Sequence, residues 1–145
     1  MPRFSKRSKN NLATADIKLQ QLFNAVIEDF DCTVIYGHRT PEEQFELFKK
    51  GREKKDGWWV KTGKTVTNLD GYIKKSKHNY YPSKAVDVVP FPLDWNDIDS
   101  FLALKEVVLR KAKELNIQVI WGADWDMDGD IKEHLLQDYP HWEIK

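Results

Sequence analysis

Apolar positions along the chain follow a helical period in two long segments. Between residues 15 and 30 they recur at spacings of three and four, as on one face of an amphipathic helix, at Leu19, Leu22, Phe23, Val26, Ile27 and Phe30. The same spacing predicts a helix over residues 97–115, with an apolar face of Phe101, Leu104, Val107, Val108 and Leu115. A third helix is predicted over residues 40–50, because Thr40, Pro41 and Glu43 form a capping-box start. Gly51 then suits the end of that helix.

Shorter apolar runs predict strands between these helices. They lie at residues 33–36, 85–89 and 117–121, and a closing strand follows Pro140. A hairpin is predicted in the lysine-rich segment 51–77, with strands at residues 58–60 and 65–67 around a turn at 61–64. This order does not repeat as βαβ units, so the sequence predicts an α+β fold, a single domain whose mostly antiparallel sheet is packed by helices.

Charge and composition exclude several classes of protein. The formal net charge is zero, which argues against a general nucleic-acid binder. Residues 1–12 are basic and are expected to form a flexible, solvated arm, with Arg3, Lys6, Arg7 and Lys9. That segment lacks the apolar core of a signal peptide, and no stretch reaches the ~20 apolar residues that span a bilayer. We therefore expect a product that starts in the cytoplasm and does not insert into membranes.

The predicted strand at residues 85–89 contains an acid that needs a partner. Asp87 lies among alanine and valine residues, and a buried carboxylate is costly unless a cation, a donor or a metal meets it. His78 precedes it by nine residues and His141 lies near the C-terminus. Two histidines and one carboxylate make the ligand count of a catalytic zinc site with an open fourth position. Cys32, the only cysteine, excludes an intramolecular disulfide and a cysteine zinc site.

Taken singly, each of these residues has an ordinary structural interpretation. His78 fits a loop histidine, Asp87 a salt-bridged core acid, and His141 a packed residue at the chain end. Asp138 stands three residues before His141, a position from which it could serve as a base. The residues alone leave the choice between these interpretations and a metal site open.

The order of these residues matches a family pattern, S-x-H-x-x-G-x-A-x-D followed by an acid, two residues and a histidine. The matching positions are Ser76, His78, Ala85, Asp87, Asp138 and His141. The sequence thereby resembles the phage L-alanyl-D-glutamate endopeptidases of the D-Ala-D-Ala metallopeptidase and hedgehog-like superfamily. Residues 36–44 resemble the arginine motif of that family, and residues 121–125 resemble the segment before its last ligand. Here His78 and Asp87 stand two residues further apart than in the pattern, and Ser83 replaces its glycine.

The resemblance assigns roles to individual side chains. It implies zinc ligands at His78, Asp87 and His141, a general base at Asp138, and a substrate-binding, transition-state-stabilising arginine at Arg39. Gln44 is expected to help orient substrate, and Ser76 is assigned to substrate binding. Trp142 and Glu143, beside His141, are weaker candidates for supporting the ligands. Without the resemblance, Arg39 would be expected to pair with the nearby glutamates.

The resemblance also implies an activity. Residues 1–145 would form one zinc peptidase domain, expected to be monomeric, that cleaves the L-Ala-D-Glu bond in the stem peptides of bacterial peptidoglycan and lyses the host. It would reach the wall from the host cytoplasm through a membrane-permeabilising holin. The alternatives are a D-Ala-D-Ala carboxypeptidase or dipeptidase with the same zinc site, and a non-catalytic zinc-binding recognition module. A plain structural protein would have to explain the ordered motif residues by chance.

Two further segments carry open interpretations. The run Asp124, Asp126, Asp128, Asp130 has the alternation of the first half of a calcium loop. Leu135 occupies the place of the bidentate glutamate, so the run is either a Ca²⁺ site or a solvated acidic turn. The paired Trp58 and Trp59 either cover the core from a long loop or form one wall of a groove for a glycan or peptide.

Overall fold

The structure, a computed structural model, describes residues 2–127 and 138–145. Within them the chain forms four α-helices, a short 3-10 helix and six strands. In order these are α1 (Lys6–Ala13), α2 (Ile17–Asp29), β1 (Cys32–Tyr36), α3 (Pro41–Lys49), β2 (Arg52–Lys55), β3 (Trp58–Lys61), η1 (Lys77–Asn79), β4 (Ala85–Pro90), α4 (Ile98–Leu115), β5 (Ile120–Trp121) and β6 (His141–Glu143). None of the described helices has both the length and the apolar character needed to cross a lipid bilayer.

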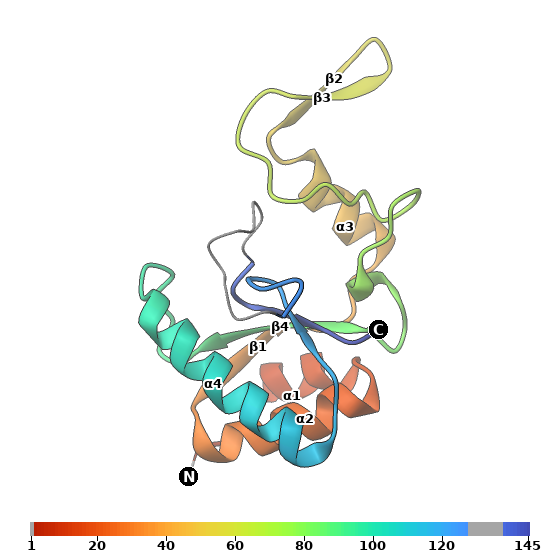
Figure 1. The fold of residues 1–145 in the computed structure, drawn as a ribbon. Coiled ribbons are helices and arrows are strands. Elements are labelled where there is room, and N and C mark those ends of the chain that lie inside the picture. Colours follow the sequence, from red (N-terminus) through yellow and green to blue (C-terminus); the bar gives the residue numbers. More distant parts are fainter. Residues whose placement is uncertain (1, 128–137) are drawn as a thin grey trace.

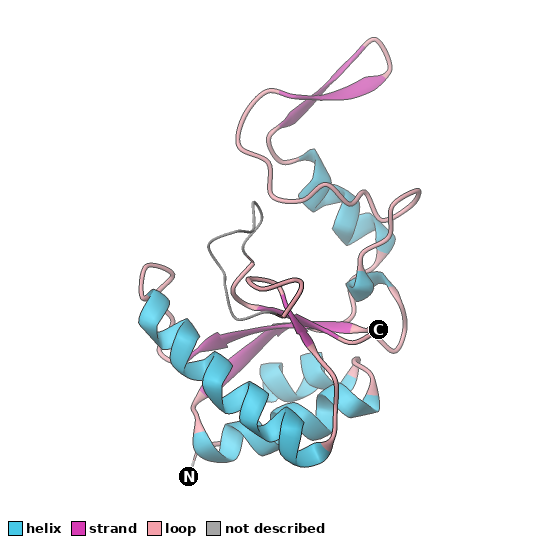
Figure 2. Cartoon of the chain, in the orientation of Figure 1, coloured by secondary structure: helices cyan, strands magenta, loops and turns pink. Residues whose placement is uncertain are grey.

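A four-stranded sheet in the order β1-β4-β6-β5 organises the chain, and each pair of neighbouring strands is antiparallel. Helices α1, α2 and α4 lie together on one side of this sheet (Figures 1 and 2). The predicted α+β class with a mostly antiparallel sheet is confirmed. The strand predicted over residues 117–121 is shorter in the structure, because only Ile120 and Trp121 pair with β6.

Alternation along the strands separates the core from the opposite face of the sheet. Val86, Val88 and Trp142 belong to the core cluster beside the helices. Successive side chains of a strand point to opposite faces, so Asp87 of β4 and His141 of β6 point away from that core. These two residues are direct partners in the register of β4 and β6. The sheet therefore presents its polar central residues on the face that the three helices leave uncovered.

The N-terminal segment is not the flexible basic arm that the sequence predicted. Residues Lys6–Ala13 form α1, whose first turn is capped by the Ser5 hydroxyl, which accepts from the Ser8 amide at 3.1 Å. Phe4 and Leu12 are buried in the core. Within the helix the buried residues Ser8 and Leu12 stand four positions apart on one face, and Phe4 packs just before the cap. This pattern was hidden by the basic residues that point to solvent. The expectation for residues 1–12 is therefore corrected.

The predicted hairpin is also corrected in its register. Strands β2 and β3 pair around Asp56 and Gly57, which both adopt positive φ, and residues 65–67 form no strand. Asp-Gly is a favoured two-residue turn because both positions need positive φ. Trp59 packs edge-on against Phe45 of α3 with ring centroids 5.7 Å apart, whereas Trp58 is 76 % exposed. Trp59 therefore covers α3 and not the main core, and neither tryptophan lines the cleft described below.

Truncating the apolar face of α1 should destabilise the whole domain. Leu12 is 3 % exposed within the core, so we expect Leu12→Ala to lower the free energy of unfolding by about 2–5 kcal/mol, as for other buried leucines. Urea unfolding followed by circular dichroism measures this change. Lys9→Ala, at an exposed position of the same helix, is the control and should stay within about 0.5 kcal/mol. A neutral Leu12→Ala would show that α1 contributes nothing to the core.

Candidate active site

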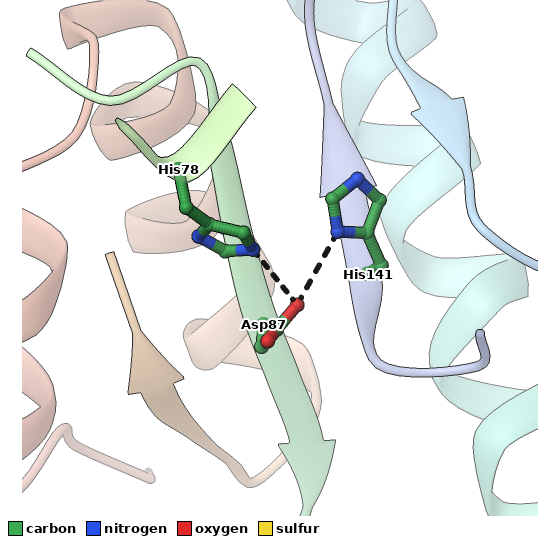
Figure 3. A group of neighbouring side chains, drawn as sticks. All are labelled: His78, Asp87 and His141. Atoms are coloured by element: carbon green, nitrogen blue, oxygen red, sulfur yellow. Dashed lines mark hydrogen bonds and ion pairs between the residues drawn. The ribbon is translucent and has the colours of Figure 1, made fainter. Parts of the chain in front are cut away.

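The carboxylate of Asp87 lies between two imidazole rings (Figure 3). Its Oδ1 atom is 3.2 Å from Nε2 of His78 and 3.5 Å from Nδ1 of His141. All three residues are buried. The structure therefore brings together the three predicted ligands, one from η1, one from β4 and one from β6.

A chain of local hydrogen bonds fixes the His78 ring. Ser76 caps η1 by accepting from the His78 amide at 3.2 Å, and the Asn79 side chain accepts from the Ser76 amide at 2.8 Å. The His78 Nδ1 atom is 2.7 Å from the carbonyl oxygen of Gly37. A carbonyl oxygen only accepts, so Nδ1 must carry the proton. In a neutral ring this leaves the lone pair of Nε2 facing Asp87.

The His141 ring is held in the same manner from the opposite side. Its Nε2 atom lies 2.8 Å from Oε1 of Glu143. Strand alternation puts Glu143 on the face of His141, and its carboxylate accepts a hydrogen bond from the protonated Nε2 atom. Nδ1 is thereby directed at Asp87. An outer oxygen acceptor that orients a ligating imidazole is the usual support of a metal-binding histidine, so Glu143 fits the supporting role considered from sequence.

This arrangement suits a bound cation. With the outer nitrogens protonated, two lone pairs face a carboxylate oxygen, and such acceptors repel one another unless a proton or a metal ion lies between them. The candidate ligand atoms of His78, Asp87 and His141 all lie within 4.8 Å of one another. Among the described residues, these three could hold a metal ion.

The longer spacing between His78 and Asp87 does not separate them. Tyr80 and Tyr81 are exposed, so the extra length bulges into solvent. Ser83 is fully buried just before β4, and its backbone bonds to Thr14 and Asp16 in the connection between α1 and α2 at 2.9 and 2.8 Å. Its hydroxyl donates to the Ala85 carbonyl at 2.7 Å. A small residue is sufficient here, and the absence of the family glycine is accommodated.

Electrostatics of the metal-free group favour opposite charges on Asp87 and His141. Burial opposes ionisation of Asp87, but hydrogen bonds from His141 and His78 outweigh burial and hold the pKa of that carboxyl well below its usual range. Burial likewise opposes protonation of His141. Its hydrogen bonds with Asp87 and Glu143 prevail and raise the pKa of His141 to about 9. The site thus attracts a positive charge at the position between the rings.

Asp138 enters the site through a tight turn before β6. Its amide donates to the Gly122 carbonyl at 2.8 Å, the His141 amide donates to the Asp138 carbonyl at 3.1 Å, and the Gly122 amide donates to the His141 carbonyl at 2.8 Å. Burial, together with the negative charge of Asp87, raises the pKa of the Asp138 carboxyl. A carboxyl group with a raised pKa is suited to accept and return a proton near neutral pH.

Arg39 closes the group from the side of β1. Its Nη2 atom lies 3.4 Å from Oδ2 of Asp87, and its Nη1 atom donates to the Gln44 side chain at 2.8 Å. The guanidinium carbon stands 4.4 Å from the ring centre of Tyr36. Sequence reasoning did not single out Tyr36, although an aromatic three residues before an arginine is a possible cation–π partner. The expected pairing of Arg39 with the nearby glutamates is not what the structure shows.

Gln44 and Ser76 hold other residues of the site in place. Gln44 is 1 % exposed, and its Nε2 atom donates to the Leu69 carbonyl at 2.9 Å. The Ser76 hydroxyl is engaged with the amide of His78. Direct contact of either side chain with substrate stays a prediction from sequence.

A cleft of about 620 Å³ opens over these residues. It is lined by all three candidate ligands, Arg39 and Asp138, and by two tryptophans that sequence reasoning did not assign to it, Trp95 and Trp125. Trp125 packs against His141 with ring centroids 5.4 Å apart. The cleft is large enough for several residues of an extended peptide.

The acidic run before the Asp138 turn is only partly described. Asp128 and Asp130 lie outside the described residues, while Asp124 is buried and Asp126 is described beside it. The Ca²⁺ site proposed on these four residues therefore stays a prediction of the sequence.

Fold and site together define the class of protein. A carboxyl of raised pKa and an arginine in an open cleft are suited to a hydrolase, and the buried histidine, aspartate and histidine group beside them could hold a metal ion. A model of the family described as "Phage L-alanyl-D-glutamate peptidase" matches residues 1–145. The chain belongs to this family.

Two known proteins show how far the likeness extends. The "L-alanyl-D-glutamate peptidase" of Escherichia phage T5 is 27 % identical over an alignment of 139 residues, and the alignment covers 92 % of this chain and 88 % of that protein. The crystal structure of the Serratia marcescens L-Ala D-Glu endopeptidase ChiX has the same fold, with a TM-score of 0.69 and 22 % identity. That likeness covers 99 % of this chain and 91 % of the other.

Gly122 should be required for the geometry of the site. A Cβ atom added there would collide with the Asp138 carbonyl oxygen and stand 2.8 Å from Cβ of His141. We expect Gly122→Ala to lower kcat/KM by about 100-fold, since a displacement near 1 Å in a catalytic group costs that much. Steady-state cleavage of a peptidoglycan fragment measures it. Gly63→Ala is the control, because a Cβ there meets only ordinary contact at 3.8 Å. Equal activity of both variants would contradict this role of Gly122.

Proposed function

We propose that this chain is a zinc-dependent endopeptidase that cleaves the L-Ala-D-Glu bond in the stem peptides of bacterial peptidoglycan. The observation that carries the proposal is the convergence of His78, Asp87 and His141 beside Asp138 in one cleft. Family membership over the whole chain supports the choice of substrate. The names of the phage T5 relative and of ChiX refer to the same bond.

The donor set supports zinc as the metal. Two imidazole nitrogens and one carboxylate oxygen form a three-ligand catalytic zinc site, with the fourth position left for water or substrate. Zinc held by His78, Asp87 and His141 would supply Lewis acidity and lower the pKa of a water molecule to about 7. The outer hydrogen bonds to the Gly37 carbonyl and Glu143 keep the two rings turned toward the centre.

Proton transfer is assigned to Asp138. Its carboxylate takes a proton from the attacking water, and the resulting acid passes that proton to the departing amine of the D-Glu residue. The raised pKa of Asp138 suits both steps, because the group can hold the proton between them. The turn through Gly122 keeps this carboxyl beside His141.

Charge stabilisation on the substrate is assigned to Arg39. As the peptide carbonyl becomes tetrahedral its oxygen gains negative charge, and a preorganised cation nearby lowers the barrier. Contacts with Gln44, Asp87 and Tyr36 hold the guanidinium in place before substrate arrives. Through this contact with Arg39, Gln44 would orient the substrate indirectly.

The biological setting follows from the substrate. An enzyme that cuts stem peptides lyses a bacterium when it reaches the wall, and from the host cytoplasm it needs a holin that permeabilises the membrane. Expression of the chain alone should leave cells intact, and coexpression with a pore-forming protein should lyse them. Lysis by Asp138→Asn under the same conditions would contradict an enzymatic cause.

The first prediction of the mechanism concerns the metal. The purified protein should contain one zinc per chain by elemental analysis. His141→Ala removes a ligand and should release zinc and abolish cleavage. Glu143→Gln is the companion variant, because it keeps an oxygen acceptor for the imidazole and should retain most of the metal. Stoichiometric zinc in His141→Ala would contradict the ligand assignment.

The second prediction separates catalysis from metal binding. Asp138→Asn should keep the zinc and the fold while reducing turnover by about 10²- to 10⁴-fold, the usual contribution of general acid-base catalysis. Elemental analysis and steady-state kinetics on the same preparation measure both. Loss of zinc in this variant would make Asp138 a ligand instead of a base.

The third prediction identifies the scissile bond and tests the rival functions. Digestion of a purified muropeptide should release the glycan with its lactyl-L-Ala and a peptide with a new D-Glu amino terminus, as read by mass spectrometry. Release of D-Ala or of the D-Ala-D-Ala dipeptide would indicate a carboxypeptidase or dipeptidase with the same site. Binding of the muropeptide without any product would favour a recognition module.

A further inference from the structure

The segment that follows α3 projects from the body of the protein as a separate lobe (Figure 1). We call residues 49–77, from the last residue of α3 to the first of η1 and including β2 and β3, the hairpin lobe. It contains ten lysine or arginine residues and three acidic ones, an excess of seven positive charges. Because the whole chain has a formal net charge of zero, all other residues together carry the opposite excess. The charge of the protein is therefore strongly polarised.

The hairpin lobe has a small aromatic base of its own. Phe45 of α3 contacts Phe48, Trp59 and Tyr72 with ring centroids 5.7–5.9 Å apart. Arg52 stacks on Phe48 and donates to the carbonyl oxygens of Phe48 and Thr67 at 2.7 and 2.8 Å. These contacts fix one face of the hairpin against α3, so its other face is held outward.

The outward face combines an indole with positive charges. Trp58 is 76 % exposed and pairs directly with Lys55 across the hairpin, so the two side chains share that face. Further exposed lysines lie elsewhere on the lobe. Strand alternation puts Lys54 and Lys61 on the other face of the hairpin, and Lys64, Lys74 and Lys75 follow in the loop after β3. Among the described residues, no ion pair neutralises Lys55 or these five lysines. Such a cluster attracts polyanions over distances near the Debye length, about 8–10 Å.

The hairpin lobe is continuous with the catalytic cleft. Its residues Val66, Thr67, Leu69, Lys75 and Lys77 line the same cleft as the candidate metal ligands. A polymer that is bound in the cleft and extends past this wall must run over the lobe. Trp58, Lys54, Lys55, Lys61 and Lys64 do not line the cleft, so they are available to a part of the polymer that is not being cut.

We propose that the hairpin lobe is a second binding surface for the peptidoglycan network, which rests on the function proposed above. The lysines contact the free carboxylates of uncut neighbouring stem peptides, and Trp58 packs against the apolar face of a sugar ring. Peptidoglycan fits better than a plain polyanion because it offers sugar rings and carboxylates together. Two linked contacts hold the enzyme on the insoluble wall more strongly than the cleft alone.

The test compares an insoluble with a soluble substrate. The variant Lys54→Gln, Lys55→Gln, Lys61→Gln, Lys64→Gln should lose about tenfold or more of its rate and cosedimentation on intact sacculi at low enzyme concentration. Its turnover of a short soluble muropeptide should stay within about twofold of wild type. The matched control, Lys6→Gln, Lys9→Gln, Lys18→Gln, Lys113→Gln, removes the same charge from exposed positions elsewhere and should change neither. Equal sacculus binding by both variants would overturn the proposal.

Variants of the two tryptophans distinguish stacking on a bound sugar from a contribution to folding stability. Trp58→Ala should weaken cosedimentation with sacculi and leave the thermal unfolding temperature unchanged, and Trp58→Phe should restore most of the binding. Trp59→Ala should instead lower the unfolding temperature, because Trp59 packs on Phe45. Undiminished sacculus binding by Trp58→Ala would overturn the role of the indole.

Two further experiments identify the polymer that is bound and distinguish failure of the lobe as a binding surface from failure of the proposed function. Sacculi stripped of attached anionic polymers should retain the protein; if binding disappears with those polymers, the partner is not peptidoglycan. If wild type fails to cut the soluble muropeptide, the proposed function fails. The difference in cosedimentation between lobe and control variants still decides the binding surface, because it needs no cleavage.

Discussion

Much of the site depends on one constraint, the burial of the Asp87 carboxylate in the central strand of the sheet. A buried charge is unfavourable unless cations and donors meet it, and here two imidazoles and a guanidinium do so. Each of these groups is held in turn by an acceptor behind it, the Gly37 carbonyl, Glu143 or Gln44. The carboxylate thus determines the orientation of side chains from η1, β6 and the loop after β1.

The two faces of the sheet carry different kinds of side chains. The face covered by the helices holds the continuous apolar core. The other face holds the charged and polar groups of the site, which are not part of that core. Changes in the exposed loops are consequently absorbed without moving the ligands. The bulge at Tyr80 and Tyr81 lengthens the chain between His78 and Asp87. Backbone bonds of Ser83 to the connection between α1 and α2 nevertheless fix the chain before β4, and His78 Nε2 lies 3.2 Å from Asp87 Oδ1.

The hairpin lobe and the site are mechanically connected at Gln44. Its amide bonds to Arg39 on one side and to the Leu69 carbonyl on the other. Gly71 approaches so closely that a Cβ atom there would lie 2.9 Å from Cβ of Gln44. The lobe that we propose to bind the wall and the arginine that we propose to bind the reacting carbonyl therefore share one buried amide, so a displacement of the lobe is expected to shift Arg39.

The sequence by itself determined the features that arise from local periodicity and residue type. These are the long helices and the buried strand with its acid, because short-range spacing is sufficient to specify them. The set of candidate ligands came instead from the resemblance to a family pattern. Tertiary structure decided what depends on distant partners. Basic charges concealed the core face of α1, whose Leu12 is buried only by packing on other elements. The hairpin turn, by contrast, follows from a local signal, because Asp-Gly favours the positive φ that Asp56 and Gly57 adopt. Strand alternation already suggested Glu143 as the acceptor behind His141, two residues away. The orientation of the His78 ring was fixed by an acceptor 41 residues away, the Gly37 carbonyl, and no linear pattern encodes such a three-dimensional direction.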